Sequence, residues 1–354
     1  MKTFNSIFLS SILFFNCGSV TNENETAANK EKPYNFEGKV IISDDAGQTW
    51  NSLDMYIPKD INIVSTSSDS KKLFIGSEKA EYKILDMASP ENAISENVMK
   101  AIINKSPIIE NWVSEVFSVP SGQFTHVYGD GLFIKNNGTD YWQPIPTPEG
   151  IHGISKIVED SRGNILMACQ FGVYKSSDNG QTWNRIFKYG FANNIILRNE
   201  TIWVVGINGI HQSTDRGNTW SQVDNIQSKT GWHTNEDNAI NMFENNNVLY
   251  VFKRNQASIV SPGSACALIY SEDNGKTWKN HPAEKYLKNQ KDVQKLYLHQ
   301  NIYFYTTKNH LMRSVDNGLT WQNIISIEDT SQNMTFRLIS VGGKLVCVKM
   351  DNGC

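Results

Sequence analysis

The chain has 354 residues, 39% of them hydrophobic, and a formal net charge of −3 at pH 7. Its lysines and arginines are dispersed, which argues against a nucleic-acid surface, because such surfaces carry clustered basic residues. The spacing of the five cysteines matches no metal-ligand pattern. We therefore expect neither a metal site nor a cofactor.

Residues 1–17 have the pattern of a targeting signal. Lys2 makes the start positive, residues 7–15 form an apolar run too short to span a bilayer, and Cys17 follows. This arrangement resembles a bacterial lipoprotein signal. It predicts acylation at Cys17 and a lipid anchor in the bacterial cell envelope outside the cytoplasm, on the outer membrane or the cell surface. A secretory signal cleaved nearby is the alternative.

Residues 18–36 are polar and have no apolar period, which predicts a flexible tether. Residues 37–354 then form the folded part. In this part, Cys169 and Cys347 each lie in the middle of an apolar run, where a thiol packs as a small hydrophobic group. A bridge between Cys347 and Cys354 is an alternative in an oxidising compartment.

One octapeptide, Ser-x-Asp-x-Gly-x-Thr-Trp, occurs five times. Each copy follows a short apolar run. Asp accepts hydrogen bonds from backbone N–H groups in a tight turn, and Gly supplies a positive φ. The pattern therefore predicts a strand, a turn and a second strand, with the Trp packed below. We assign structural roles to the aspartates and tryptophans of the five copies: Asp45, Asp178, Asp215, Asp273 and Asp316, with Trp50, Trp183, Trp220, Trp278 and Trp321.

These copies resemble the Asp-box, or BNR repeat, of sialidases, sortilin-type receptors and Ycf48-like photosystem-assembly factors. The resemblance implies an all-β fold, a β-propeller whose blades have four antiparallel strands. It also implies that each box lies between the third and fourth strands, away from the ligand face. The aspartates do not fit a calcium loop, because they lack its alternating oxygen ligands and distal Glu.

Counting the repeats predicts seven blades. A sixth, degenerate copy ends at Trp142, and three strand-like runs between Trp50 and Trp142 supply a blade without a box. The chain enters at residues 39–42 with only the outer half of a blade, and residues 335–339 and 344–348 offer two further strands. We therefore expect N- and C-terminal strands to share one blade and close the ring.

Three long connections, residues 88–111, 224–238 and 253–266, are the places where a ligand site is expected, because function concentrates on long loops of rigid scaffolds. Trp232 stands in a polar stretch of one of them. Arg337 alternates with apolar residues on an expected innermost strand, which predicts a water-filled centre or an acidic partner group. The candidate binding patch is Trp232, His233, Arg254 and Arg337.

A sialidase is the enzyme that the repeat most suggests. Sialidases hold the substrate carboxylate with three arginines, the first in a Phe/Tyr-Arg-Ile-Pro motif near the start of the propeller, yet no arginine precedes Arg162 here. Other glycosidases need paired carboxylates, and Glu149, Glu236, Asp237 and Glu284 cannot be paired from sequence. We assign no catalytic residue. The alternative is a glycoside hydrolase acting on glycans.

The sequence thus predicts a lipid-anchored, monomeric propeller that binds or assembles a protein, peptide or glycan without chemistry.

Overall fold

The computed structural model describes residues 32–98, 113–206, 209–223, 239–254, 266–287, 289–290, 293–327 and 334–351. Residues from Pro33 onward form one compact unit. Several predictions lie outside the described residues: the leader with Cys17, most of the tether, Trp232, His233 and Cys354. Within the described ranges, no helix is long and apolar enough to cross a membrane.

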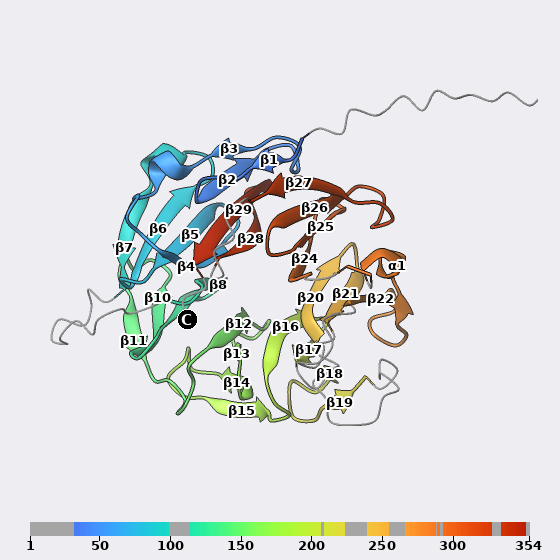
Figure 1. Ribbon diagram of the computed structural model, residues 1–354. Helices are drawn as coiled ribbons and strands as arrows, with labels where there is room; N and C mark the ends of the chain where they lie inside the picture. The colour runs from blue at the N-terminus through green and yellow to red at the C-terminus, as the bar shows by residue number, and fades with distance from the viewer. Residues whose placement is uncertain are drawn as a thin grey trace, which may run out of the picture. The chain divides into compact units, whose positions relative to one another are not determined.

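The folded unit is a seven-bladed β-propeller, as the repeats predict (Figure 1). The blades, numbered in chain order, have these strands from the centre outward. Blade 1 has β28 (Met334–Val341), β29 (Lys344–Asp351), β2 (Val40–Ser43) and β3 (Asn51–Ser52); blade 2 has β4 (Ile63–Ser68), β5 (Lys72–Ser77), β6 (Glu81–Asp86) and β7 (Ile94–Asn97); blade 3 has β8 (Phe117–Val119), β9 (Gly122–Val127), β10 (Gly131–Asn136) and β11 (Gln143–Ile145). Blade 4 has β12 (Ile154–Glu159), β13 (Ile165–Cys169), β14 (Gly172–Ser176) and β15 (Asn184–Phe187); blade 5 has β16 (Ala192–Arg198), β17 (Thr201–Gly206), β18 (Gly209–Ser213) and β19 (Ser221–Gln222). Blade 6 has β20 (Ala239–Asn245), β21 (Val248–Arg254), β22 (Cys266–Ser271) and β23 (Lys279–Asn280); blade 7 has β24 (Lys295–His299), β25 (Ile302–Thr306), β26 (His310–Ser314) and β27 (Gln322–Ser326).

Blade 1 contains strands from both ends of the propeller. Strand β2 pairs antiparallel with β29, with Ile41 opposite Cys347. Most side chains of both strands are buried, because they pack against the blades on either side. Three short helices complete the described structure: η1 (Asp54–Tyr56), η2 (Pro90–Asn92) and α1 (Glu284–Leu287).

The folded unit begins earlier than its composition indicates. Strand β1 (Tyr34–Asn35) pairs parallel with β27, outside blade 7. The next residue, Phe36, is only 1% exposed and stacks on Phe336, with ring centroids 6.1 Å apart. The sequence assigned residues 34–36 to the tether because their neighbours are polar. The pairing with β27 and the buried ring of Phe36 together hold them against the fold.

Part of the expected connection at residues 88–111 is also a strand. Strand β7 pairs antiparallel with β6, with Lys83 opposite Ser95. None of its side chains is buried, since it is the outermost strand of blade 2. An outer strand with no buried face lacks the alternation of apolar and polar residues by which strands are identified.

The antiparallel pairing defines two faces of the ring. Turns between strands one and two, and between strands three and four, lie on one face, and that face carries all five boxes; we call it the box face. Turns between strands two and three, and connections from one blade to the next, lie on the opposite face, which we call the connection face. Inner strands start at the connection face.

Apolar side chains fill the spaces between adjacent blades. The largest fully buried residues include Trp142, Trp203 and Phe304. Cys169 and Cys347 are free, buried thiols within these layers. The side chains on each inner strand alternate between its two neighbouring blades, so Leu296 packs toward blade 6 while Tyr297 packs toward blade 1.

Candidate functional site

The polar side chains of each box turn form hydrogen bonds within the same turn. In the blade 4 box, the Asp178 carboxylate accepts hydrogen bonds from Ser176 Oγ (2.7 Å), Thr182 N (2.8 Å) and Thr182 Oγ1 (2.6 Å). Ser176 Oγ also accepts the Gly180 N–H at 2.8 Å. The same four bonds recur in the boxes of Asp45, Asp215, Asp273 and Asp316.

These hydrogen bonds hold the box carboxylates ionised. At Asp178, Asp215, Asp273 and Asp316, bonds from the threonine side chain and backbone lower the pKa to about 2. Burial opposes the shift at Asp45, but the bonds from Thr49, Ser43 and Gln48 outweigh it and also lower the pKa to about 2. A carboxylate with its oxygens so occupied is a poor general acid at neutral pH.

Each box also fastens its blade to the preceding blade. Gly180 has φ of 87°, and a Cβ there would lie 2.6 Å from Ile145 Cδ1 of blade 3. Trp183 donates its indole N–H to Pro146 O at 3.0 Å, and Trp220 donates to Ile186 O at 2.8 Å. Trp183 and Trp220 are only half-buried, whereas Trp142 of the degenerate copy is 2% exposed.

The connection face carries a series of exposed rings over blades 3 to 5. Tyr128 and Phe171 lie in the turns between strands two and three, and His152 and Tyr189 lie in the connections between blades. Tyr128 is 60% exposed, Tyr189 55% and Phe171 39%. We call Tyr128, His152, Phe171 and Tyr189 the aromatic band.

Neighbouring contacts join and orient the band. The rings of Tyr128 and His152 have centroids 6.4 Å apart. The Phe171 ring covers Gly150 in the connection that carries His152, at 3.3 Å from an ideal Cβ position. Tyr189 stacks on the buried His211 with an interplanar angle of 4°. Its ring is therefore held by neighbouring rings while 55% of the residue stays exposed, which favours binding at low entropic cost.

A second group of side chains, the axial cluster, lies around the axis of the ring. It consists of Glu115, Lys156, Lys295 and Arg337, from the inner parts of blades 3, 4, 7 and 1. Arg337 and Glu115 form an ion pair with side chains 22% and 30% exposed. Lys295 Nζ lies 5.4 Å from the centroid of the Tyr297 ring, a cation–π contact.

The axial cluster contains more positive than negative charge. Three cationic side chains act there with one carboxylate, and that carboxylate is paired with Arg337. Loss of hydration lowers the pKa of Lys295 to about 8, and repulsion from Arg337 adds to the effect. The Lys295 ammonium thus lies in a positive potential that its surroundings do not cancel.

The backbone on both sides of Glu115 is hydrogen-bonded to blade 2. The carbonyl of Ser114 accepts hydrogen bonds from Ser65 Oγ (2.9 Å) and Tyr82 OH (2.6 Å). The N–H of Val116 donates to Ser67 Oγ at 2.8 Å. These bonds fix the backbone beside Glu115 to blade 2, so the carboxylate is presented to Arg337 across that blade.

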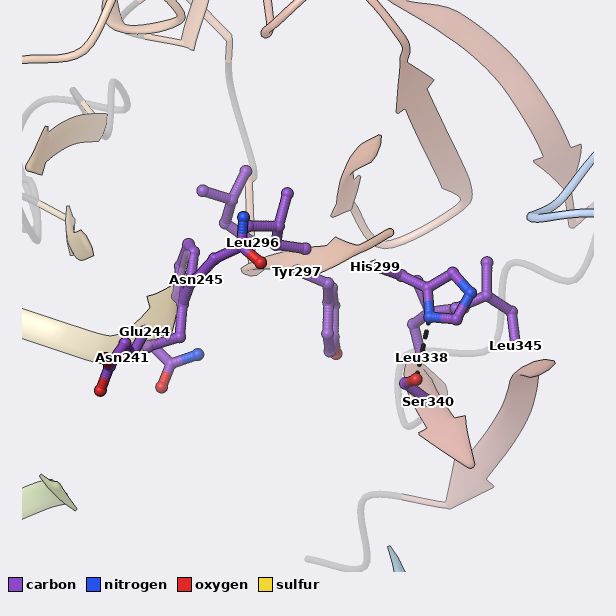
Figure 2. Close-up of a pocket in the computed structure, with 11 residues that line it drawn as sticks. Asn241, Glu244, Asn245, Leu296, Tyr297, His299, Leu338, Ser340 and Leu345 are labelled. Atoms are coloured by element: carbon purple, nitrogen blue, oxygen red, sulfur yellow. Dashed lines mark hydrogen bonds between the residues drawn. The ribbon is translucent and has the colours of Figure 1, made fainter. Parts of the chain in front are cut away.

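Toward the box face, the inner strands of blades 6, 7 and 1 enclose a cavity of about 210 Å³ (Figure 2). Tyr297 and His299 reach it from β24, Asn241 from β20 and Ser340 from β28. His299 Nδ1 bonds Ser340 Oγ at 2.9 Å. Burial lowers the pKa of His299 and raises that of Tyr297 to about 12, so both are neutral near pH 7.

Of the predicted binding residues, the structure describes the side chain of Arg337 alone. Its acidic partner group is Glu115, which the sequence did not single out. Arg254 ends β21 opposite Cys266. Lys295 and Lys156 were also missed. The local signal at Lys295 is a lysine that starts a short apolar strand. This signal does not identify a site, because the charged residues near Lys295 come from distant parts of the chain. Within the described ranges, no group of His, Cys, Asp and Glu side chains could hold a metal ion.

Comparisons with known proteins agree with this architecture. The family model for the BNR/Asp-box repeat matches residues 269–280, the box of blade 6. A search of curated protein sequences gives no match. Solved structures similar to this chain include one titled Ycf48 bound to D1 peptide, with 14% identity, a TM-score of 0.52, and 82% of this chain and 94% of that chain covered.

Two further structures show how widely the fold is shared. An extracellular domain from B. thetaiotaomicron, assigned to a one-component system, has 13% identity and a TM-score of 0.54, covering 91% of this chain and 42% of that chain. An ancestral GH74 enzyme has 12% identity and a TM-score of 0.52, covering 82% of this chain and 48% of that chain. At these identities the likeness concerns the fold.

Proposed function

We propose that this seven-bladed Asp-box propeller is a non-catalytic binding or assembly module that holds a protein or peptide segment on its connection face. The aromatic band carries the proposal. Exposed rings fixed by neighbouring contacts are typical of protein hot spots, because they bury a large area and lose few rotamers. The Ycf48 structure bound to a D1 peptide is a precedent for peptide binding on this fold.

Among the described residues, the box face carries no comparable series of exposed rings; Tyr141 is exposed there by itself. The polar groups of this face are bonded within the turns, and its exposed apolar residues, such as Leu319 and Val315, stand in the box turn itself. The predicted patch of Trp232, His233 and Arg254 remains part of the proposal.

A matched pair of tyrosines tests the binding face. Tyr128 is 60% exposed on the connection face, and Tyr141 is 56% exposed on the box face. Full-length protein, its Tyr128→Ala and Phe171→Ala variants and the Tyr141→Ala control are cross-linked in envelope membranes, and the captured partner is identified. Its affinity for each purified protein is then measured by calorimetry.

We expect Tyr128→Ala to weaken binding by at least about 2 kcal/mol, roughly thirtyfold, while Tyr141→Ala binds as wild type. Equal losses for the two tyrosines, or no loss for either, would place the binding surface elsewhere. Capture of glycan rather than protein would replace the peptide assignment.

A glycoside hydrolase is the second candidate, since exposed rings also stack on sugars. Such an enzyme needs two carboxylates at a set separation. Among the described side chains of the axial cluster, Glu115 is the one carboxylate, and it is paired with Arg337. Turnover of fluorogenic sialosides or aryl glycosides by the full-length protein would favour the enzyme.

We also propose that the module is a lipoprotein of the bacterial cell envelope. The leader that ends at Cys17 supports this, and an extracellular propeller of similar fold is a precedent. Cys17→Ser should abolish fatty-acid labelling and release the protein from membranes. A Cys17→Ser protein that stays membrane-bound, with no label on wild type, would refute the anchor.

A further inference from the structure

The axial cluster is an arrangement that folding alone does not require. Its charges come from four different blades, and each can be removed without opening the apolar layers, since Arg337, Glu115 and Lys295 all keep part of their surface in contact with solvent. Clustering three cations costs free energy through repulsion, so a counter-charge beyond Glu115 would stabilise the group.

We propose that Arg337 and Lys295 form an anion subsite that takes a carboxylate of the bound segment, with Glu115 occupying it in the free protein. The inference rests on the proposed peptide-binding function and names the chemistry that this ligand must carry. A guanidinium matches a carboxylate bidentately, and the nearby ammonium adds a second, less directional contact.

Three observations support the assignment. The Arg337–Glu115 pair shows that the guanidinium already holds a carboxylate in this place. Lys295 has no acidic partner among the ion pairs of the described residues, and its ammonium is attracted by Glu115 while Arg337 and Lys156 repel it. Lys295 is the first residue of β24, so it lies at the connection face, where the aromatic band is exposed.

The cavity of Figure 2 is lined by none of the residues of this subsite, and its polar groups are of a different kind. Its polar lining contains one carboxylate, Glu244, and no lysine or arginine; the other polar residues are Tyr297, His299, Asn241, Asn245 and Ser340. The anion is therefore expected at the Lys295 end of the axis, where Tyr297 separates the charges from the cavity.

Short peptides test the subsite without the natural partner. Full-length protein is titrated by calorimetry at low ionic strength with acetyl-triglutamate amide, which has side-chain carboxylates only. Acetyl-triglutamine with a free C-terminus has a terminal carboxylate only, and its amide is neutral. We expect at least one anionic peptide to bind and the neutral one not to bind. The better anion identifies the source of the carboxylate.

Variants then locate the binding. Arg337→Gln and Lys295→Gln should each lose about tenfold in affinity or more, because a charge partner is removed. Glu115→Gln should bind the anionic peptide more tightly, since its competitor is gone, and a gain cannot arise from misfolding. Lys279→Gln on the outer strand β23 is the control and should bind as wild type. Melting temperatures check the fold of each variant.

The pH dependence gives an independent measure. Arg337, Glu115, Lys156 and Tyr297 are the titratable groups that face Lys295. The pKa of Tyr297 is raised to about 12, so its hydroxyl stays protonated in the range that the experiment covers. Affinity for the anionic peptide should therefore fall as pH rises from 7 to 9, through the pKa of Lys295 of about 8. Lys295→Gln should abolish that change.

The outcomes separate this inference from the proposed function. Equal binding of anionic and neutral peptides, an unchanged Arg337→Gln variant, or no gain from Glu115→Gln would overturn the subsite, even if Tyr128→Ala still lost the natural partner. Anion binding with the expected variant pattern, together with unchanged partner capture by Tyr128→Ala and Phe171→Ala, would uphold the subsite and refute the role of the aromatic band.

Discussion

The two faces of the ring use similar residue types for opposite purposes. On the box face, Ser, Asp and Thr bond one another within eight residues, and the same bonds recur five times. On the connection face, the described turns share no such repeated set of bonds, and rings such as Tyr128 and Tyr189 are exposed. Five of the seven blades close their outer hairpin with the same turn, whereas a single ligand contacts each blade differently. The repeated residues therefore belong to the fold, and the residues that do not repeat are the candidates for function.

The largest expected effect is a loss of stability on truncating a buried residue of the fold. Trp142 is 2% exposed and packs against Tyr82 in the layer between blades 2 and 3. Trp142→Ala should lower the free energy of unfolding by about 3–5 kcal/mol, because the cavity would lie in a close-packed layer. Denaturant titration of wild type, Trp142→Ala and the neighbouring control Tyr141→Ala measures it. A loss no greater than that of the control would mean that the layer collapses around the gap.

The degenerate copy at Trp142 shows how far sequence could lead. The sequence predicts seven blades from five intact boxes, one degenerate copy and three strand-like runs, because a turn of fixed geometry requires fixed residues. The repeat predicts a packed Trp in every copy, yet Trp183 is half-buried, whereas Trp142 of the degenerate copy is buried. The depth of each Trp depends on the preceding blade, and the repeat itself carries no information about that neighbour.

The axial cluster illustrates what sequence could not supply. Arg337 was identified from the alternation of its strand, and an acidic partner was one of the two expectations. Glu115 could not be named, because it reaches Arg337 across a whole blade, held by Ser65, Ser67 and Tyr82. Charges that meet at the axis come from strands far apart in the chain, and their meeting depends on the closure of the ring.

A smaller loss of stability is expected on replacing the serine that begins each box. Ser176 is 1% exposed, and its Oγ accepts the buried N–H of Gly180. Ser176→Ala should cost about 1–3 kcal/mol, since that donor would lose its partner away from water. Thermal and urea unfolding give the value, and Ser176→Thr is the conservative comparison. Binding by the folded variant should be unchanged; a loss of binding at native stability would show that the box face contributes to the site.

The box carboxylates should also make stability depend on acid. Their pKa is lowered to about 2 in the folded protein, below the ordinary value of 3.8. Unfolding releases these carboxylates to bind protons more readily, so their contribution is fully present above about pH 4 and is lost as pH falls toward 2. Urea midpoints measured between pH 5 and pH 2 should fall, and Asp178→Asn should show a shallower fall than wild type. Parallel slopes would mean that other carboxyl groups dominate acid unfolding.

The smallest change in stability is expected where the change in binding is largest. Tyr128 lies in a turn of the connection face with 60% of its surface exposed, and its described ring contact is the side of His152. Tyr128→Ser should therefore alter the free energy of unfolding by no more than about 0.5 kcal/mol, as is usual for surface positions. Urea unfolding of Tyr128→Ser beside Ser176→Ala compares one residue from each face under identical conditions. If Tyr128→Ser destabilised the protein as much as Ser176→Ala, the Tyr128 ring would be a packing residue of the fold. The distinction between the two faces would then fail at Tyr128, which is more exposed than Phe171 and Tyr189 of the aromatic band.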